Sequence, residues 1–414
     1  MLFTSFRLLT LLLLRPGGFI RDWSDFDTYL GIASLSDYGL YPYLHFWLEW
    51  PPIVPWLMVG AYKLSLLLPL WEDSRFWFAT ILGTVFVLFE GGNFILLYRL
   101  ARKLLPNPMQ VSRVLWLYAG LFPPVYAMLG FFDGVALFFI LLSLNLILQD
   151  KPRLSAATAA LGFTVKLTPI LMAGTAAKYL LHKYRPNRRK LFGAWLAYGL
   201  VFAGTALLLL LPFLLTHPEW LLTSAKATLG RSSWETLWAV REGYYGFGKV
   251  LGDRLNPAET AFAVHPASLP WGLISLAFAA LYLALFFRPA KFSRPRPVIA
   301  FTGLTVALFL LYSKGYSPQF LVYVLPFIIL LMPNLTGLGY ALLLTLLNAL
   351  EQPLYFVILP NEHWLLTAIV IARFALLIAL SIEFAVQVGF EFQVSSFKFG
   401  VWGAKLRGAL FAVV

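Results

Sequence analysis

Long apolar stretches, separated by short basic loops, recur along nearly the whole chain. Residues that face lipid must be apolar, and about 20 of them are needed for each helical crossing of a bilayer. Hydrophobic residues make up 60% of the 414 residues, whereas charged residues make up 12%, about half of the usual share. This composition excludes a soluble enzyme, a disordered protein and a nucleic-acid-binding domain. The sequence therefore predicts an all-α polytopic membrane protein.

The formal net charge of +13 fits this class, because Lys and Arg collect in the cytoplasmic loops of membrane proteins. The chain has no cysteine, so it has no disulfide framework and no thiolate chemistry. Its five histidines are scattered along the chain, which argues against a histidine metal cluster.

The order of polar and apolar segments predicts one membrane domain of about 11–13 transmembrane helices with two large outer loops that contain interfacial helices. The expected parts are a first helix (1–20), a first outer loop (21–51), a helical bundle (52–215), a second outer loop (216–268), a further bundle (269–388) and a cytoplasmic tail (389–414). Two full spans between residues 51 and 98 would put the next basic loop on the wrong side. The topology of that segment stays open at this point.

Two acids, Asp25 and Asp27, stand just after the first apolar stretch, in a loop that holds five of the 19 acids of the chain. Two carboxylates one residue apart suit a general base, or a divalent cation with bound phosphate. Solvated loop acids are the plainer interpretation. Nearby aromatic residues, among them Tyr29 and Tyr43, suit stacking on sugar rings or a lipid headgroup.

Lys166 lies within an apolar run, where a charge is costly and indicates a functional site by default. The plainer alternative is a lysine that extends to the interface. Pro169 follows three residues later and suggests a break that turns the ammonium toward a polar cavity. A lysine there is suited to hold a phosphate as a point charge.

Two further turns carry polar groups. Lys314 and Gln319 flank a turn between apolar stretches and suit phosphate and hydroxyl recognition, although an ordinary loop explains them equally well. Asp133 stands at the tip of a helical hairpin, either as a helix N-cap or as a functional acid.

The second outer loop interleaves bases with aromatic residues, including Arg231 and Trp234. Such a set is suited either to clamp a lipid-linked anion or to anchor the loop at the interface. Glu351 is a further costly acid, inside an apolar stretch, and we expect it to face the bundle interior.

Several short motifs follow one another in a familiar order. They are Asp25-Phe-Asp27 with Tyr29, Tyr41-Pro-Tyr43, Trp50-Pro-Pro52, Gly162…Lys166-Leu-Thr-Pro169, and Ser317-Pro-Gln-Phe320 with Pro326 beyond. Together they resemble the GT-C class of integral-membrane glycosyltransferases, among them GPI mannosyltransferase I and bacterial polyprenol-phosphate-mannose-dependent relatives. The hairpin tip departs from the pattern, because Gly130-Phe-Phe-Asp133 keeps only the glycine and the acid.

The resemblance implies a GT-C-like bundle that transfers a hexose, with mannose the first expectation, from a polyprenyl-phosphate donor to a lipid-linked or glycan acceptor. It implies inversion with Asp25 as general base and Asp27 as the next candidate. The expected phosphate ligands are Lys166, Lys314 and Arg231, and the expected substrate contacts are Tyr29, Tyr43, Asp133, Gln319, Trp234 and Glu351.

The resemblance also places the active site on the extracytoplasmic face of the plasma membrane, with membrane lipids as surroundings and no nucleic acid as partner. No cofactor is required, because the leaving group carries a single phosphoryl unit, although Asp25 and Asp27 are compatible with a divalent metal.

Two other functions stay open. A transporter or flippase of a lipid-linked or anionic substrate would use Lys166, Glu90 and Glu351 along its path, although transporters tend to have paired repeats that this sequence lacks. The second of these other functions is that of a scaffold subunit with a degenerate site. Replacing Asp25 by Asn separates an enzyme from a transporter.

Overall fold

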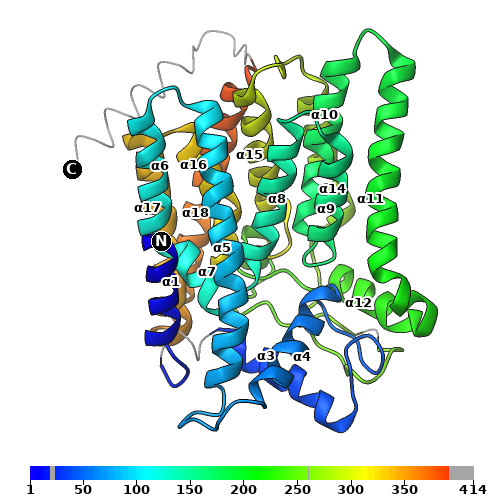
Figure 1. Cartoon of the computed structure of the whole chain (residues 1–414), viewed down its shortest axis with the longest axis vertical. Helices are drawn as coiled ribbons and strands as arrows, with labels where there is room; N and C mark the ends of the chain where they lie inside the picture. The colour runs from blue at the N-terminus through cyan, green and yellow to red at the C-terminus, as the bar shows by residue number, and fades with distance from the viewer. Residues whose placement is uncertain (19–23, 260, 391–414) are drawn as a thin grey trace.

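The computed structural model describes residues 1–18, 24–259 and 261–390. In these ranges the chain forms an upright bundle of helices and no β-strand, only two isolated bridges, Pro42–Phe46 and Trp234–Gly315 (Figure 1). The prediction of an all-α polytopic membrane protein is confirmed. Nearly all of the expected tail, 389–414, lies outside the described residues.

The bundle and the layer at its lower end contain 17 α-helices and several shorter helical turns in the described part of the chain. The upright elements are α1 (Leu2–Leu13), α5 (Phe76–Leu104), α6 (Pro108–Gly120), α7 (Phe122–Gly130), α8 (Asp133–Ile147), α9 (Pro152–Phe163), α10 (Met172–Tyr184), α11 (Arg188–Thr216), α14 (Trp271–Phe287), α15 (Pro295–Tyr312), α16 (Leu321–Leu331), α17 (Leu335–Ala349) with the π-helical η4 (Leu350–Ile358), and α18 (His363–Val388). The others are α3 (Phe26–Ser34), α4 (Ile53–Ser65), α12 (Pro218–Gly230), α13 (Leu237–Arg241), and the 3-10 turns η1 (Leu35–Tyr38), η2 (Thr168–Leu171) and η3 (Pro318–Phe320).

Five of the described helices are long and apolar enough to cross a membrane, or up to six if the bent pair α7–α8 counts as one crossing. This is fewer than the 11–13 expected. Outside the open segment 51–98, the sequence count took each apolar stretch as a full crossing. Several of them form helices of 9 to 15 residues, shorter than the roughly 20 residues of a single full crossing, so the lower number counts the long helices alone.

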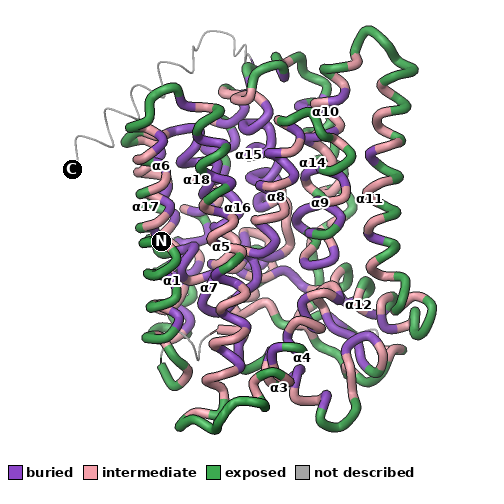
Figure 2. Tube along the Cα trace, viewed as in Figure 1, coloured by how far each residue is buried: buried purple, intermediate pink, exposed green. Residues whose placement is uncertain are grey.

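Burial separates the centre of the bundle from its lipid-facing rim. Every residue of α16 is buried, and α15 is buried over most of its length (Figure 2). By contrast, only 6% of the apolar window of α11 is buried, although the hydropathy of α11 is higher than that of α15. An apolar helix exposed to this degree needs lipid around it.

The segment 51–98 contains one span, α5, and one short helix, α4. With 13 residues, α4 lies beside α3 at the lower end of the bundle (Figure 1). The single crossing removes the difficulty with the side of the next basic loop. The first outer loop therefore extends past the expected boundary at residue 51.

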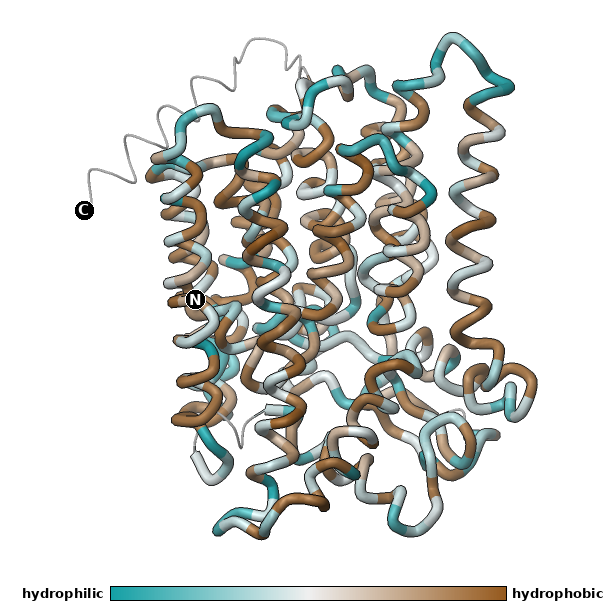
Figure 3. Tube along the Cα trace, viewed as in Figure 1, coloured by the Kyte–Doolittle hydropathy of each residue, from teal (hydrophilic) through white to brown (hydrophobic). Residues whose placement is uncertain are grey.

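The two outer loops pack on each other at this lower end. Glu49 of the first loop pairs with Arg254 of the second at 2.5 Å, and the backbone N–H of Trp47 donates to the Arg254 carbonyl. The basic loops near residues 99–113, 151–153, 182–190 and 288–296 lie at the opposite end, where Figure 3 shows the most hydrophilic turns. The two packed outer loops thus lie at one end of the bundle, and the basic loops lie at the other end.

Candidate functional site

Asp25 lies at the start of α3, half-buried, where the first outer loop meets the bundle. The hydroxyl of Tyr29, one turn later, donates to Asp25 Oδ2 at 3.3 Å. Tyr29 itself is fully buried against the Trp50 and Phe132 rings. Burial raises the pKa of Asp25 to about 6, while the charge of Lys166 and the Tyr29 hydrogen bond partly oppose that rise. A carboxyl with this pKa is matched to proton transfer near neutral pH.

Asp27 faces a different direction. Its carboxylate is half-exposed and pairs with Arg75 at 3.1 Å, and Arg75 also binds Asp73 at 2.7 Å. Asp25 and Asp27 therefore do not converge on one point. Among the described residues, no group of three or more His, Asp or Glu side chains comes together in a way that could hold a metal ion. The expected compatibility of these two acids with a divalent metal stays a prediction.

Lys166 lies in the turn between α9 and η2. The turn folds back on itself closely, because a Cβ added at Gly162 would lie 2.8 Å from the Pro169 ring. The Lys166 ammonium donates to Asp133 Oδ1 at 2.5 Å. It also lies 4.9 Å from the Phe132 ring centre and 4.7 Å from that of Phe320. Its side chain keeps 18% of its surface exposed, so the ammonium is held by its partners and is still accessible from outside the protein.

Asp133 is the first residue of α8, just after the 118° bend between α7 and α8. Its carboxylate is buried, accepts from Lys166, and accepts from the Tyr323 hydroxyl at 2.8 Å. No side-chain cap bond is formed at this helix start, so the N-cap explanation does not apply. Gly130 lets the bend dock on the first loop, because a Cβ there would lie 2.7 Å from Ser24 Oγ and closer still to its Cβ.

Residues from four distant parts of the chain thus meet at the lower end of the bundle. Asp25 comes from the first loop, Asp133 from the hairpin tip, Lys166 from the second hairpin, and Tyr323 from α16. The charges of Lys166 and Asp133 both act on Asp25. The sequence did not single out Tyr323, because a tyrosine in an apolar run carries no signal of its own.

Arg231 of the second loop lies within electrostatic reach of Asp25, whose charge acts on it together with those of Glu49 and Glu235. Its guanidinium lies 3.8 Å from the Trp234 ring centre and donates to the Gly248 carbonyl. Trp234 in turn donates to Ser317 Oγ at 3.1 Å. Trp234 therefore ties the second loop to the turn that precedes η3.

The comparison with known families decides the class of this protein. The model of glycosyltransferase family 87 matches residues 61–313, which are 253 of the 414 residues. The chain belongs to glycosyltransferase family 87. No curated protein matches the chain. The matched region contains Asp133, Lys166 and Arg231, whereas Asp25 precedes it and Tyr323 follows it.

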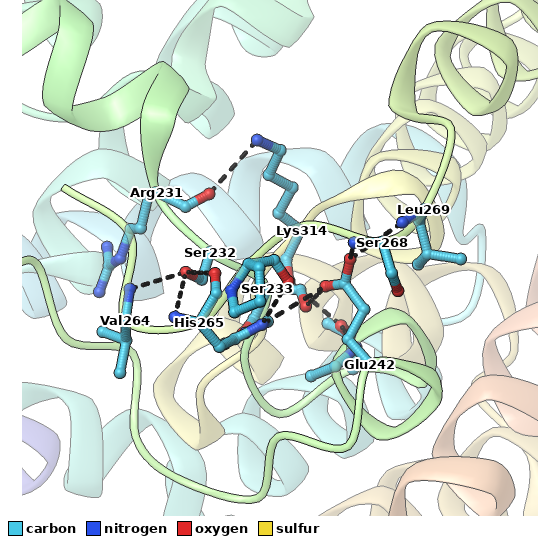
Figure 4. Close-up of polar contacts among 12 residues, drawn as sticks. Arg231, Ser232, Ser233, Glu242, Val264, His265, Ser268, Leu269 and Lys314 are labelled. Carbon is cyan, nitrogen blue, oxygen red and sulfur yellow. Dashed lines mark hydrogen bonds and ion pairs between the residues drawn. The ribbon is translucent and has the colours of Figure 1, made fainter. Parts of the chain in front are cut away.

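Lys314 of this glycosyltransferase holds the second loop together. Its ammonium donates to the Arg231 carbonyl at 3.3 Å (Figure 4). It also donates to the Leu229 carbonyl at 2.9 Å and so caps the end of α12. Beside it, Glu242 accepts from the Ser233 hydroxyl and the backbone N–H groups of Ser268 and Leu269. The expected contact of Lys314 with a donor phosphate stays a prediction.

Two other expected substrate contacts, Tyr43 and Gln319, have different surroundings in the glycosyltransferase. The Tyr43 hydroxyl donates to the carbonyls of Leu48 and Trp50, which closes the first loop on itself. Gln319 is half-buried in η3, next to Phe320, whose ring contacts Lys166. Their roles toward substrate stay predictions.

Glu351 is fully buried and pairs with Arg373 of α18. Arg373 also donates to the Glu235 carbonyl, and its guanidinium lies 3.7 Å from the Tyr316 ring centre. This pair therefore anchors the second loop to the bundle. Arg373 was missed, although a lone arginine in an apolar stretch is a signal of its own.

Proposed function

We propose that this membrane glycosyltransferase takes a hexose, mannose in the first place, from a polyprenyl-phosphate donor and transfers it to a lipid-linked or glycan acceptor. The observation that carries the proposal is a half-buried acid, Asp25, within the electrostatic reach of a cation, Lys166, that is held by Asp133 at one end of a membrane bundle. Asp25 has a pKa near neutrality, and Lys166 lies close enough for its charge to lower that pKa. Such an acid is suited to deprotonate an acceptor hydroxyl, and such a cation is suited to stabilise a departing phosphate.

The proposed reaction is a single displacement with inversion. The acceptor oxygen attacks the anomeric carbon, and its proton passes to Asp25. The bond between the anomeric carbon and the phosphate oxygen breaks, and the electron pair leaves with the polyprenyl phosphate. Lys166, with Arg231 as the second cation, stabilises the charge of that leaving group. No step of the proposal requires a metal.

The substrate contacts of the proposal keep the expected residues. Tyr29 and Asp133 have the strongest support, because both lie within the Asp25 cluster. The proposal also keeps four further substrate contacts, which belong to the same loops or anchor them: Tyr43, Gln319, Trp234 and Glu351. Asp27, paired with Arg75, is the second candidate for the base.

The proposed location of the site is the extracytoplasmic face of the plasma membrane. The basic loops near residues 99–113, 151–153, 182–190 and 288–296 all lie at the end opposite Asp25. Lys and Arg favour the cytoplasmic side. This arrangement supports an Asp25 cluster that faces away from the cytoplasm.

The transporter hypothesis loses its support, because the chain belongs to a glycosyltransferase family. Its suggested path residues also have structural partners. Glu90 accepts from Asn93 and from the Tyr118 hydroxyl at 3.2 and 3.1 Å, and lies 3.9 Å from Arg7. Glu351 pairs with Arg373.

The donor class is tested with purified protein and a lipid acceptor extract. Radiolabelled polyprenyl-phosphate mannose, polyprenyl-phosphate glucose and a nucleotide-activated mannose are supplied separately. We expect acceptor-dependent transfer from a polyprenyl-phosphate sugar and none from the nucleotide sugar. Transfer from the nucleotide sugar alone would overturn the proposal.

A further inference from the structure

A cavity of about 210 Å³ opens at the end of the bundle opposite Asp25. It lies between the last turns of α10 and α14, where both helices reach the basic loops (Figure 1). Four basic residues line it, namely Lys178, His182, Arg185 and Arg288. The described residues of its wall include no acid. The cavity is therefore a concentrated positive site.

Lys178 fixes the shape of this cavity. Its side chain is buried, and its ammonium donates to the carbonyls of Leu285, Phe286 and Arg288 at 3.0, 2.6 and 2.9 Å. These are carbonyls at the carboxyl end of α14, whose negative dipole the ammonium offsets. Lys178 thus ties α10 to α14 and leaves anion binding to the other cations.

Those other cations are exposed and converge from two elements. Lys178 and His182 are four residues apart and share one face of α10, and Arg185 follows the last residue of α10 with a helical backbone conformation. Arg288 follows the last residue of α14. His182, Arg185 and Arg288 are all exposed to solvent. Two guanidinium groups across a small cavity suit the oxygens of a phosphate.

The surroundings favour a lipid phosphate over a soluble anion. Leu273, Leu276, Leu281 and Leu283 of α14 are exposed, as is Phe287 on the cavity wall, whereas Leu285 is buried. This apolar surface runs along α14 up to the cavity. Acyl chains on α14 would bring a headgroup to the guanidinium groups. The volume is below the roughly 300–1,000 Å³ of sites that enclose a whole drug-sized ligand, and it suits a headgroup.

We propose that this basic cavity binds the phosphate of an anionic phospholipid, independently of the proposed sugar transfer. The site lies at the end that carries the basic loops, where such pockets between helices hold anionic headgroups. Bound lipid would bridge α10 and α14.

Native mass spectrometry of the purified protein tests the proposal, with phosphatidylglycerol and phosphatidylcholine added at equal concentration. We expect the wild type to retain phosphatidylglycerol selectively. The pair of changes Arg185→Gln and Arg288→Gln should lower that retention at least about tenfold, because each surface cation contributes to anionic-lipid binding. The two single variants give intermediate losses and also cover poor folding of the double variant.

The matched control removes two other charges from the same end. Arg188 and Arg189 are exposed and lie outside the cavity, so Arg188→Gln with Arg189→Gln should retain phosphatidylglycerol like the wild type. The proposal would be overturned if this control lost as much phosphatidylglycerol as the Arg185 and Arg288 variants. It would also be overturned if the wild type retained both lipids equally, or if the Arg185 and Arg288 variants retained phosphatidylglycerol like the wild type. Displacement of the lipid by millimolar inorganic phosphate would overturn it in favour of a soluble-anion site.

Discussion

Asp25 can accept a proton only while its carboxylate is ionised, and its pKa is about 6. We therefore expect the rate of transfer to fall as the pH drops through 6. Tyr29→Phe removes a hydrogen bond that lowers this pKa, so the fall should move to higher pH. The pH profile of kcat/KM measures both effects. Tyr38→Phe, an exposed tyrosine of the same loop, should leave the profile unchanged, and an unmoved profile in Tyr29→Phe would contradict the assignment.

Lys166 should affect both the phosphate and the base. Lys166→Met removes the cation that we assign to the leaving group, and one charge that lowers the pKa of Asp25. We expect transfer to fall by about 10²–10³-fold, and the remaining activity to require higher pH. Steady-state kinetics at several pH values check this. Lys226→Met, at an exposed lysine of the second loop, serves as the control; equal losses in the two variants would argue against a specific role.

At the scale of elements, Gly130 allows the α7–α8 bend to touch the first loop. Gly130→Ala would press a Cβ into Ser24 and move Asp133 away from Asp25. We expect activity to fall at least about tenfold, because small misplacements of catalytic groups are costly. Gly120→Ala, at the end of α6 with nothing within 4 Å of the added Cβ, should stay active. The transfer activity of both variants is measured, together with their thermal midpoints to exclude unfolding. Similar activities of Gly130→Ala and Gly120→Ala would contradict the role of Gly130 in docking the bend on the first loop.

The pair Glu351–Arg373 connects η4 to α18 and anchors the second loop. Arg373→Met would leave the buried Glu351 carboxylate without its cation, at a cost of about 3–5 kcal/mol. We expect a marked drop in the thermal midpoint in detergent, partly restored by adding Glu351→Gln. Lys183→Met breaks an exposed pair with Asp150 and should change the midpoint little. A midpoint like that of the wild type in Arg373→Met would contradict the anchoring role.

At the scale of the whole molecule, the two ends of the bundle should lie on opposite sides of the membrane. The natural absence of cysteine allows single labels. Tyr38→Cys at the Asp25 end should react with an impermeant thiol reagent added outside, whereas Arg189→Cys at the basic end should react only after permeabilisation. Labelling of both from the same side would contradict the orientation.

The sequence predicted the membrane class because lipid imposes apolar composition on every exposed helix. Charges that stand out in the sequence led to Lys166 and Asp25 as candidates; the structure brings the two within electrostatic reach of each other, and their roles stay predictions. The sequence did not separate α4 from a span, because hydropathy alone does not show whether a short apolar helix crosses the bilayer or lies at its surface. Tyr323 and the Asp133–Lys166 pair depend on contacts between distant segments, which one sequence does not contain.

The most direct test of the account compares Asp25→Asn with Asp27→Asn in the transfer assay with a polyprenyl-phosphate sugar. Asp25→Asn keeps the size of the side chain and removes the base, so transfer should fall by about 10²–10⁴-fold while donor binding is retained. Asp27→Asn, whose carboxylate is half-exposed and paired with Arg75, should retain most of the activity. Wild-type transfer by Asp25→Asn, with the loss in Asp27→Asn instead, would contradict the assignment of the base.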